Sequence, residues 1–471
     1  MSLMDALRSA QTSLQIGALR SATVASNVGR AGEEGYAQRD VPTATDLTGA
    51  RALRVRRAHD AALESSHLAA RTASSGLNAR ASNLDALRGL FGGPDADGSP
   101  NALMVDLRTA MQRFASAPSS VAGATSAIDR ARDLANGLNR MESGIAALRT
   151  DADSAIARDV ETLRGLLAEF GEQNGAVVAA SRQGRDGSDA MDARARTLNS
   201  IADLVGVRAR VREHGDMVLF AGGPGGPVLH EAIGRPISFQ PSGTLTGTSV
   251  GAAPTFDGQA IGPGIGGRIG AALALRDESA PQEAERLDAI AAALVDAFRD
   301  MDGVAGAPGL FTDPAPGTPG AAGRIALNAA FDPDRGGDPF ALRDGGAGGA
   351  VPQRNPNGNG GFAALLIERI EGFSTARSFA PALGLGDPAS LLGAGAAQIG
   401  QIDRARSDVL GARDGAGSAL ERIATAHSNA TGVNVDREMA LLIEIEQSHR
   451  ASARIIAVVD RMLDDLLNAA R

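Results

Sequence analysis

Apolar residues recur at spacings of four and three near the C-terminal end of the chain. The stretch from Val433 onward contains no Pro or Gly. The recurring positions are Leu441, Ile445, Ser448, Ser452, Ile455, Val459, Met462 and Leu466. This period of 3.5 is typical of a helix that packs along a second helix. The helix would be roughly 50 Å long, and its apolar face is too broad to remain in water.

The N-terminal end carries the same rhythm. Its recurring positions are Leu3, Leu7, Ala10, Leu14, Gly17, Ser21, Val24 and Val28. Small residues at several of these positions allow two helix backbones to approach closely. Periodicity alone is also compatible with two ordinary packing helices, but the shared spacing leads us to predict that the two ends pair as a coiled coil.

Between the ends the pattern is mostly helical. We expect helices at residues 57–90, 101–115, 188–204, 268–302, 362–373 and 391–430, and one very long helix that starts near Pro118 and stops near Gly171 and Gly175. From Gly206 the pattern changes to short alternating or apolar runs bounded by Gly-rich turns, which is typical of β-hairpins. Residues 303–361 are dominated by Gly, Pro and Asp and contain one expected strand at 324–327.

Both ends also carry motifs of a known family. Ser26-Asn27-Val28 followed by Gly35-Tyr36-Ala37-Gln38-Arg39 resembles the S-N-N-I…G-Y-x-R segment of bacterial flagellar rod, hook and hook-associated proteins. Gly432 to Glu438 resembles the G-V-N-L-D-E-E opening of the last helix of the first hook-associated protein, and Leu466-Leu467-Asn468 resembles the ending of that helix. Weaker similarities lie at 189–207 and 266–301. The resemblance covers most of the chain except roughly residues 305–350.

We therefore expect a mainly α protein with a small β-rich domain, whose domains are nested. Residues 1–31 with 432–471 would form a terminal coiled-coil assembly region. Residues 50–206 with 268–302 and 362–431 would form a helical rod domain. Residues 207–267 with 303–361 would form a small β-rich outer domain.

Composition narrows the classes of function. The net charge of −9 argues against a general nucleic-acid binder. No run of about 18 apolar residues is present, so no membrane insertion is expected. The chain contains no Cys, which excludes disulfides and thiolate chemistry. Its N-terminus has neither a basic cluster nor an apolar run, unlike a cleaved secretory signal. The resemblance implies export by the flagellar type III apparatus.

Candidate chemistry is sparse, and we expect no catalytic residue, metal or cofactor. Gly262-x-Gly264-x-x-Gly267 fits a dinucleotide fingerprint, but no βαβ repeat surrounds it and a tight strand-to-helix turn is the favoured interpretation. Asp95 to Pro100 resembles the start of a calcium loop but lacks the required Gly and Glu. The six His are scattered, without an HExxH pair.

One basic cluster is present. It consists of Arg51, Arg54, Arg56 and Arg57. An anionic partner is one interpretation. A solvated face with ion pairs to Asp60 and Glu64 is the favoured one, because charge runs are usually solvated.

The resemblance implies a structural subunit that joins hook to filament outside the bacterial cell. Its partners would be hook protein, other hook-associated proteins and further copies of itself in a helical assembly, with an export chaperone on the C-terminal helix. Besides the two stripes, the assembly residues would include Asn27, Tyr36, Asn434 and Asp436 at the bends. A hook or rod subunit, a nucleotide-binding enzyme using the Gly262–Gly267 loop, and a secreted binding module are the alternatives.

Overall fold

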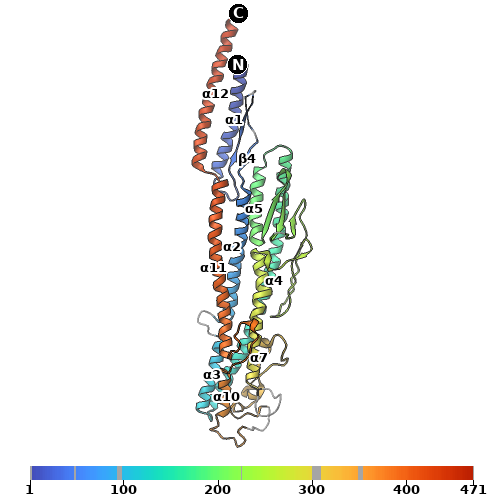
Figure 1. Ribbon diagram of the computed structural model, residues 1–471, viewed down its shortest axis with the longest axis vertical. Helices are drawn as coiled ribbons and strands as arrows, with labels where there is room; N and C mark the ends of the chain where they lie inside the picture. Colours follow the sequence, from blue (N-terminus) through green and yellow to red (C-terminus); the bar gives the residue numbers. More distant parts are fainter. Residues whose placement is uncertain are drawn as a thin grey trace.

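The computed structural model describes residues 3–46, 49–52, 54–92, 98–223, 225–299, 309–347 and 354–469. The protein is an elongated, mainly helical rod with both chain ends at the same end of the rod (Figure 1). The helices are α1 (Leu3–Gly29), α2 (Ala61–Leu90), α3 (Pro100–Ser116), α4 (Val121–Arg182), α5 (Ser188–Leu204), α6 (Gly267–Ala274), α7 (Ala280–Ala297), α8 (Ala321–Arg324), α9 (Ala341–Asp344), α10 (Ala364–Gly372), α11 (Leu391–Thr431) and α12 (Val435–Ala469).

The strands are short. They are β1 (Arg39–Asp40), β2 (Thr43–Asp46), β3 (Gly49–Ala52), β4 (Arg56–Arg57), β5 (Val207–Val211), β6 (Met217–Ala221), β7 (Val228–His230), β8 (Ile237–Ser238), β9 (Thr255–Phe256), β10 (Gln259–Ala260), β11 (Phe311–Thr312) and β12 (Ala326–Leu327). They form small sheets of two or three strands. Because α1 also contacts α12, the predicted fold class is confirmed: mainly α, with small sheets and paired terminal helices.

The long helix α4 does not stop where the sequence suggested. It spans 62 residues and runs through both Gly171 and Gly175, although Gly in a helix interior is unfavourable by about 1 kcal/mol relative to Ala. The reason is packing at Gly171. A Cβ there would lie 3.1 Å from Cε1 of His230, whose ring meets Phe170 edge-on at 5.2 Å. The absence of a side chain admits His230, and the burial that follows offsets the weak helix propensity.

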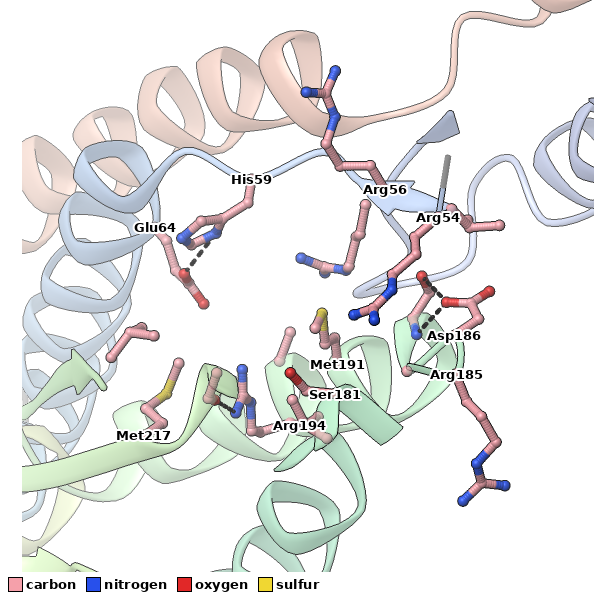
Figure 2. Close-up of a pocket in the computed structure, with 18 of the residues that line it drawn as sticks. Arg54, Arg56, His59, Glu64, Ser181, Arg185, Asp186, Met191, Arg194 and Met217 are labelled. Carbon is pink, nitrogen blue, oxygen red and sulfur yellow. Dashed lines mark hydrogen bonds and ion pairs between the residues drawn. The ribbon is translucent and has the colours of Figure 1, made fainter. Parts of the chain in front are cut away.

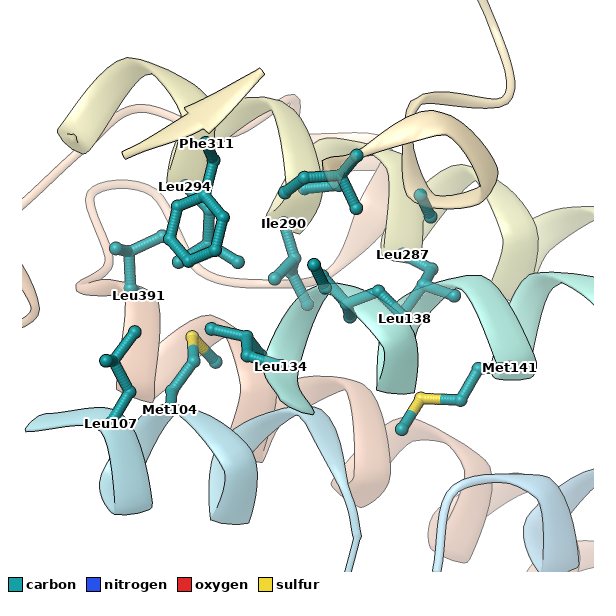
Figure 3. Packing of buried hydrophobic residues seen from close by; sticks show 14 of the residues in the cluster. Met104, Leu107, Leu134, Leu138, Met141, Leu287, Ile290, Leu294, Phe311 and Leu391 are labelled. Carbon is teal, nitrogen blue, oxygen red and sulfur yellow. The ribbon is translucent and has the colours of Figure 1, made fainter. Parts of the chain in front are cut away.

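One hydrophobic core lies at the end of the rod far from the termini. We call it the distal core. It joins α3, the first half of α4, α7, the start of α11 and the segment 309–347. Figure 3 shows Leu134 and Leu138 of α4 between Met104 of α3 and Ile290 of α7. All four side chains are at most 1% exposed.

A second core, the proximal core, lies nearer the termini. It joins the second half of α4, α5, α6 and the sheet β5–β6–β7. The hairpin β5–β6 agrees with the hairpin pattern expected from Gly206 onward, and it pairs Val207 with Ala221 and Val211 with Met217.

The two segments of the predicted β-rich outer domain contribute to different cores. Residues 207–267 contribute Leu219 and Phe256 to the proximal core, whereas 309–347 contribute Phe311 and Phe331 to the distal core. The sequence pattern had shown only that both segments are rich in turns. Neither segment has enough apolar residues for a core of its own, so each covers a different stretch of the helices.

Helices α2 and α11 lie side by side along the rod and connect the cores to the terminal helices (Figure 1). Near their upper ends the rings of His67 and His427 stack with centroids 5.5 Å apart. The last residues of α11 lead through Gly432 into α12, so the chain passes from the rod into the terminal pair with almost no linker.

Candidate assembly site

The terminal helices α1 and α12 form an antiparallel pair that extends beyond the rod (Figure 1). Ser13 Oγ lies 3.1 Å from Ser452 Oγ. One turn further into the pair, a Cβ on Gly17 would lie 4.0 Å from Cγ2 of Ile445. Small residues at these positions therefore let the two backbones approach closely.

The structure divides the predicted stripe of α12 into two faces. Ile445, Ser452 and Val459 are buried, and their spacing of seven places them on one line along the helix. Ile455 and Met462 are 47% and 50% exposed. Ile445, Ser452 and Val459 therefore face the partner helix, while Ile455 and Met462 lie on an uncovered flank.

The predicted stripe of α1 is more evenly covered. Ala10 and Val24 are buried, and Leu7, Leu14 and Val28 are half-buried, as is Leu441 on α12. Leu3 and Leu466 belong to the two helices, but their side chains lie outside the described part of the structure.

The start of α12 is held by a cap. Oδ1 of Asn434 accepts a hydrogen bond from the amide of Arg437 at 3.0 Å, which satisfies one of the free donors of the first helical turn. Asp436 is exposed in that turn, where the helix dipole favours a negative charge. The side-chain amide nitrogen of Gln38 donates to Oε1 of Glu438 at 2.7 Å, which connects α12 to the loop after α1.

A buried polar joint forms where α1 ends. Asn27 is fully buried, and its amide donates to the carbonyl of Arg39 at 2.9 Å and accepts from the Arg39 amide at 3.0 Å. The hydroxyl of Tyr36 donates to the same oxygen of Asn27 at 2.8 Å. The guanidinium groups of Arg30 and Arg39 lie 4.6 and 4.9 Å from the Tyr36 ring centre. The Asn27 side chain thus bonds both backbone groups of Arg39, as the backbone of a neighbouring β-strand would.

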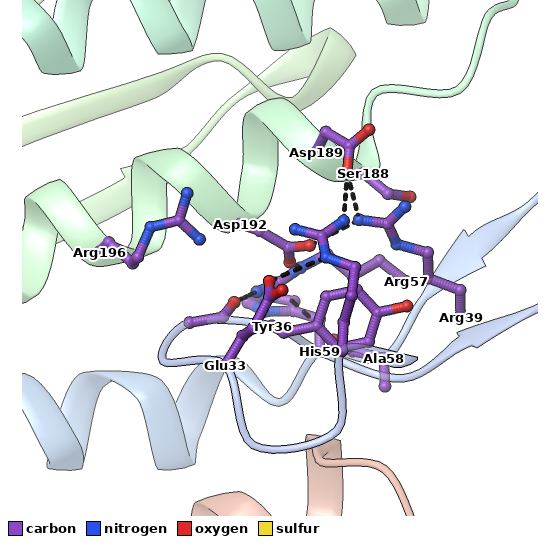
Figure 4. Close-up of polar contacts among 12 residues, drawn as sticks. Glu33, Tyr36, Arg39, Arg57, Ala58, His59, Ser188, Asp189, Asp192 and Arg196 are labelled. Carbon is purple, nitrogen blue, oxygen red and sulfur yellow. Dashed lines mark hydrogen bonds and ion pairs between the residues drawn. The ribbon is translucent and has the colours of Figure 1, made fainter. Parts of the chain in front are cut away.

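This joint is fixed to the rod through two carboxylates of α5 (Figure 4). Arg39 donates to Asp189 at 2.7 Å and to Asp192 at 2.6 Å, and Arg57 donates to the other oxygen of Asp192 at 2.7 Å. The side chain of Asp192 is fully buried, whereas that of Asp189 is 77% exposed. Hydrogen bonds from Arg39 and Arg30 lower the pKa of Asp189.

The ion pairs predicted for the basic cluster at 51–57 are therefore wrong for Arg57. Arg57 pairs with Asp192 and not with Asp60 or Glu64, while Asp60 caps α2 by accepting from the amides of Ala62 and Leu63. The spacing in sequence could not show that α5 lies beside this segment. The side chain of Arg51 lies outside the described residues.

The loop at Gly262–Gly267 shows what its glycines do in the fold. Gly267 has φ of 63°, and a Cβ on it would lie 2.5 Å from the backbone of Leu204. A Cβ on Gly76 of α2 would lie 3.1 Å from the carbonyl oxygen of Gly267. The strand before the loop, β10, is antiparallel to β9 and not part of a βαβ unit. The glycines bring backbones of α2, α5 and α6 together, as the favoured turn interpretation requires.

The residues that sequence reasoning missed are Arg39 and Asp192, which anchor the joint. Both stand inside segments whose resemblance had been noted, Gly35 to Arg39 and Asp189 to Val207. The positive charge of Arg39 in one segment and the negative charge of Asp192 in the other were the only indication in the sequence that the two segments pair. Within the described residues no group of His, Asp or Glu is arranged to hold a metal ion. Both Asp residues of the segment Asp95–Pro100, which resembles the start of a calcium loop, lie outside the described residues. No described helix has the length and apolar character needed to cross a membrane.

Comparisons with known proteins agree with the end motifs. Residues 84–304 match the family model described as flagellar hook-associated protein FlgK helical domain. Residues 425–469 match the model described as flagellar basal body rod FlgEFG protein C-terminal. No curated protein sequence matches the chain significantly.

A solved structure, the flagellar hook junction protein FlgK from Burkholderia pseudomallei, is 20% identical with a TM-score of 0.44. The match covers 53% of this chain and 47% of that one, so it spans about half of that protein's length. The family resemblance predicted from the sequence is confirmed by the two family models, which together span both the rod helices and the terminal helix. The chain is therefore similar to the flagellar hook-associated protein FlgK family over its rod helices and to flagellar basal body rod proteins over its terminal helix.

Proposed function

We propose that this protein is a structural subunit of the bacterial flagellum that joins the hook to the filament and has no catalytic role. The observation that carries the proposal is the terminal pair, which extends from the rod and leaves apolar side chains uncovered. Ile455, Val458 and Met462 of α12 are 47, 48 and 50% exposed. At about 100° per residue they lie on one flank of the helix.

Covering the exposed flank of α12 would stabilise an assembly. Fully burying one such side chain contributes about 1.5–3 kcal/mol, and each of these is half covered in the monomer. Contact with neighbouring subunits would cover all three at once. A repeated contact of this kind between different faces of successive subunits builds a tube. The partners would be hook protein, other hook-associated proteins and further copies of this chain.

The same flank would serve before assembly. An amphipathic helix with one uncovered apolar flank is suited to binding in the groove of an export chaperone. We include this chaperone, export by the flagellar type III apparatus without a cleaved signal peptide, and a location at the hook–filament junction outside the cell in the proposal. The support is the similarity to the two flagellar family models together with the exposed flank.

The test compares three variants of the subunit in cells. Deletion of residues 435–471 removes α12 and should leave the rod folded but absent from flagella. The double variant Ile455→Glu, Met462→Glu should leave the monomer folded, because each side chain is about half exposed, and yet fail to enter flagella. Ala453→Glu adds one such charge at an exposed position on the opposite flank and should assemble normally. Normal motility of the deletion or of the double variant would refute the proposal.

A second candidate is a hook or rod subunit, because the match at residues 425–469 is described as a basal body rod C-terminal segment. Electron microscopy of a strain lacking the protein separates the two. Loss of a junction subunit should leave completed hooks without filaments, whereas loss of a rod or hook subunit should leave no complete hook. The match of residues 84–304 to a hook-associated helical domain favours the junction.

A further inference from the structure

A cavity of about 350 Å³ lies between α4, α5 and the segment that leads into α2 (Figure 2). It lies apart from the apolar stripes of α1 and α12. Its apolar wall is formed by Val55, Val177, Met191, Ala195, Leu198, Val211 and Met217. The volume is within the usual range of small-ligand pockets, about 300–1,000 Å³.

The polar side of the cavity is strongly positive, although the whole chain has a net charge of −9. Its lining includes Arg54, Arg56, Arg57, Arg185 and Arg194. In Figure 2, Arg56 and Arg185 point away from the space, whereas Arg54 and Arg194 approach it from opposite sides.

Two carboxylates also line the cavity, and both already have partners. Asp186 accepts hydrogen bonds from the amide and hydroxyl of Ser188 at 2.9 and 2.6 Å. Glu64 lies 3.3 Å from Nδ1 of His59.

Arg194 is the unusual group. Its side chain is 8% exposed, and its Nη1 donates only to the amide oxygen of Asn174 at 2.8 Å and the carbonyl of Gly215 at 2.7 Å. Among the described residues no carboxylate lies within 4 Å of it, and burial lowers its pKa. A buried cation with neutral partners alone is costly, so an anion in the cavity would stabilise it.

Arg54 provides a second free cation. It too has no carboxylate within 4 Å among the described residues, and its guanidinium lies over the turn between α4 and α5. A Cβ on Gly184 would lie 2.9 Å from its Nη2. Gly184 has φ of 69°, which favours glycine, and the missing side chain leaves this place for Arg54.

We propose that this cavity binds a carboxylate on a short aliphatic stem. The carboxylate would lie between Arg54 and Arg194, because the planar guanidinium group matches carboxylate geometry. The stem would lie against the apolar wall, where Met191 and Met217 can adjust their shape to it. The carboxylate could belong to a free organic acid or to an Asp or Glu side chain of a neighbouring subunit.

The first experiment titrates the purified protein with hexanoate and follows the ¹³C-labelled methyl groups of its methionines by NMR. The resonances of Met191 and Met217 should shift in a saturable manner, while those of Met104 and Met111 in the distal core should not. Hexylammonium, hexanol, and sodium chloride at the same ionic strength are the controls for charge sign, stem and screening. No saturable shift, or an equal response to hexanol, would overturn the proposal.

Substitutions then locate the anion. Arg54→Gln changes an exposed rim residue and should weaken hexanoate binding roughly tenfold or more, given the strength of charge-assisted hydrogen bonds. Arg194→Gln should weaken it at least as much, and if this variant does not fold, Arg54→Gln decides alone. Arg158→Gln, at an exposed position of α4 outside the cavity, should leave binding unchanged. Undiminished binding in Arg54→Gln contradicts the assignment.

The Arg54→Gln variant also separates the two sources of the carboxylate. Normal incorporation into flagella, combined with lost hexanoate binding, assigns the cavity to a free acid. Reduced incorporation of a variant that is folded and secreted assigns it to the acidic side chain of a neighbour.

Discussion

The two carboxylates of α5 that hold Arg39 form a natural matched pair for mutation. Asp189 and Asp192 bond the same guanidinium at 2.7 and 2.6 Å, from the same helix and one turn apart. They differ in burial, because the side chain of Asp192 is fully buried and that of Asp189 is 77% exposed. The substitutions Asp192→Asn and Asp189→Asn keep the shape of each side chain and remove only its charge.

We expect the two losses to differ severalfold. Removing one partner of a buried ion pair typically costs about 3–5 kcal/mol, since the other charge stays buried. Asp192→Asn leaves both Arg39 and Arg57, which are 8% and 14% exposed, without their buried carboxylate, so a loss of about 3 kcal/mol is expected because the amide oxygen can still accept one bond. An exposed pair contributes about 0–1 kcal/mol, which is the loss expected for Asp189→Asn.

The assay is equilibrium unfolding in guanidinium chloride followed by circular dichroism, together with amide hydrogen exchange. Exchange should increase in residues 30–40 of the Asp192→Asn variant, because Arg39 fixes this loop to the rod. The double variant Arg39→Met, Asp192→Asn should lose less than the sum of its single changes, since Arg39 is then removed together with its buried partner and only Arg57 is left without the carboxylate. Equal losses for Asp189→Asn and Asp192→Asn would refute the reasoning, because burial would then not determine the strength of the contact.

Two further predictions concern the same end of the rod. Gly35→Ala should destabilise the protein by about 1–3 kcal/mol, because Gly35 has φ of 79° and a Cβ there would lie 2.6 Å from Cγ of Arg196. Gly32→Ala, at a position with positive φ but no atom within 4 Å, should cost less in the same unfolding assay. Burial lowers the pKa of both His67 and His427, so the unfolded chain binds protons more readily and stability should fall as the pH drops below about 6.5. The double variant His67→Gln, His427→Gln should lose this part of the pH dependence in thermal melts between pH 7.5 and 5.5, and an unchanged profile would contradict the assignment.

The terminal helices are the part of the fold that sequence pattern predicts well. The period of 3.5 in its apolar residues already predicts that α12 packs along a second helix, because helix geometry returns each seventh residue to nearly the same direction. The start of α12 can also be predicted from the sequence, since Asn434 lies directly before the periodic residues and caps the helix. These features depend on local geometry, which is determined by residues close together in the sequence.

The pattern could not predict the end of α4 or the partner of Arg57. Gly171 looks like a helix stop until His230, from a strand far along the chain, occupies the space beside it. Arg57 is followed within a few residues by Asp60 and Glu64, but it bonds Asp192 because α5 lies beside it in the fold. Both outcomes depend on contacts between segments that are distant in sequence.

The sequence by itself therefore determined the helical rod, the paired ends and the resemblance to flagellar proteins, since periodicity, caps and end motifs are local properties. Only the tertiary structure decided which stripe positions are covered, how the turn-rich segments divide between the two cores, and how Asp192 fixes the joint. It also brought Arg54 and Arg194 to opposite sides of one cavity. The physical reason is that burial and charge compensation are set by neighbours in space, and no spacing along the chain encodes them.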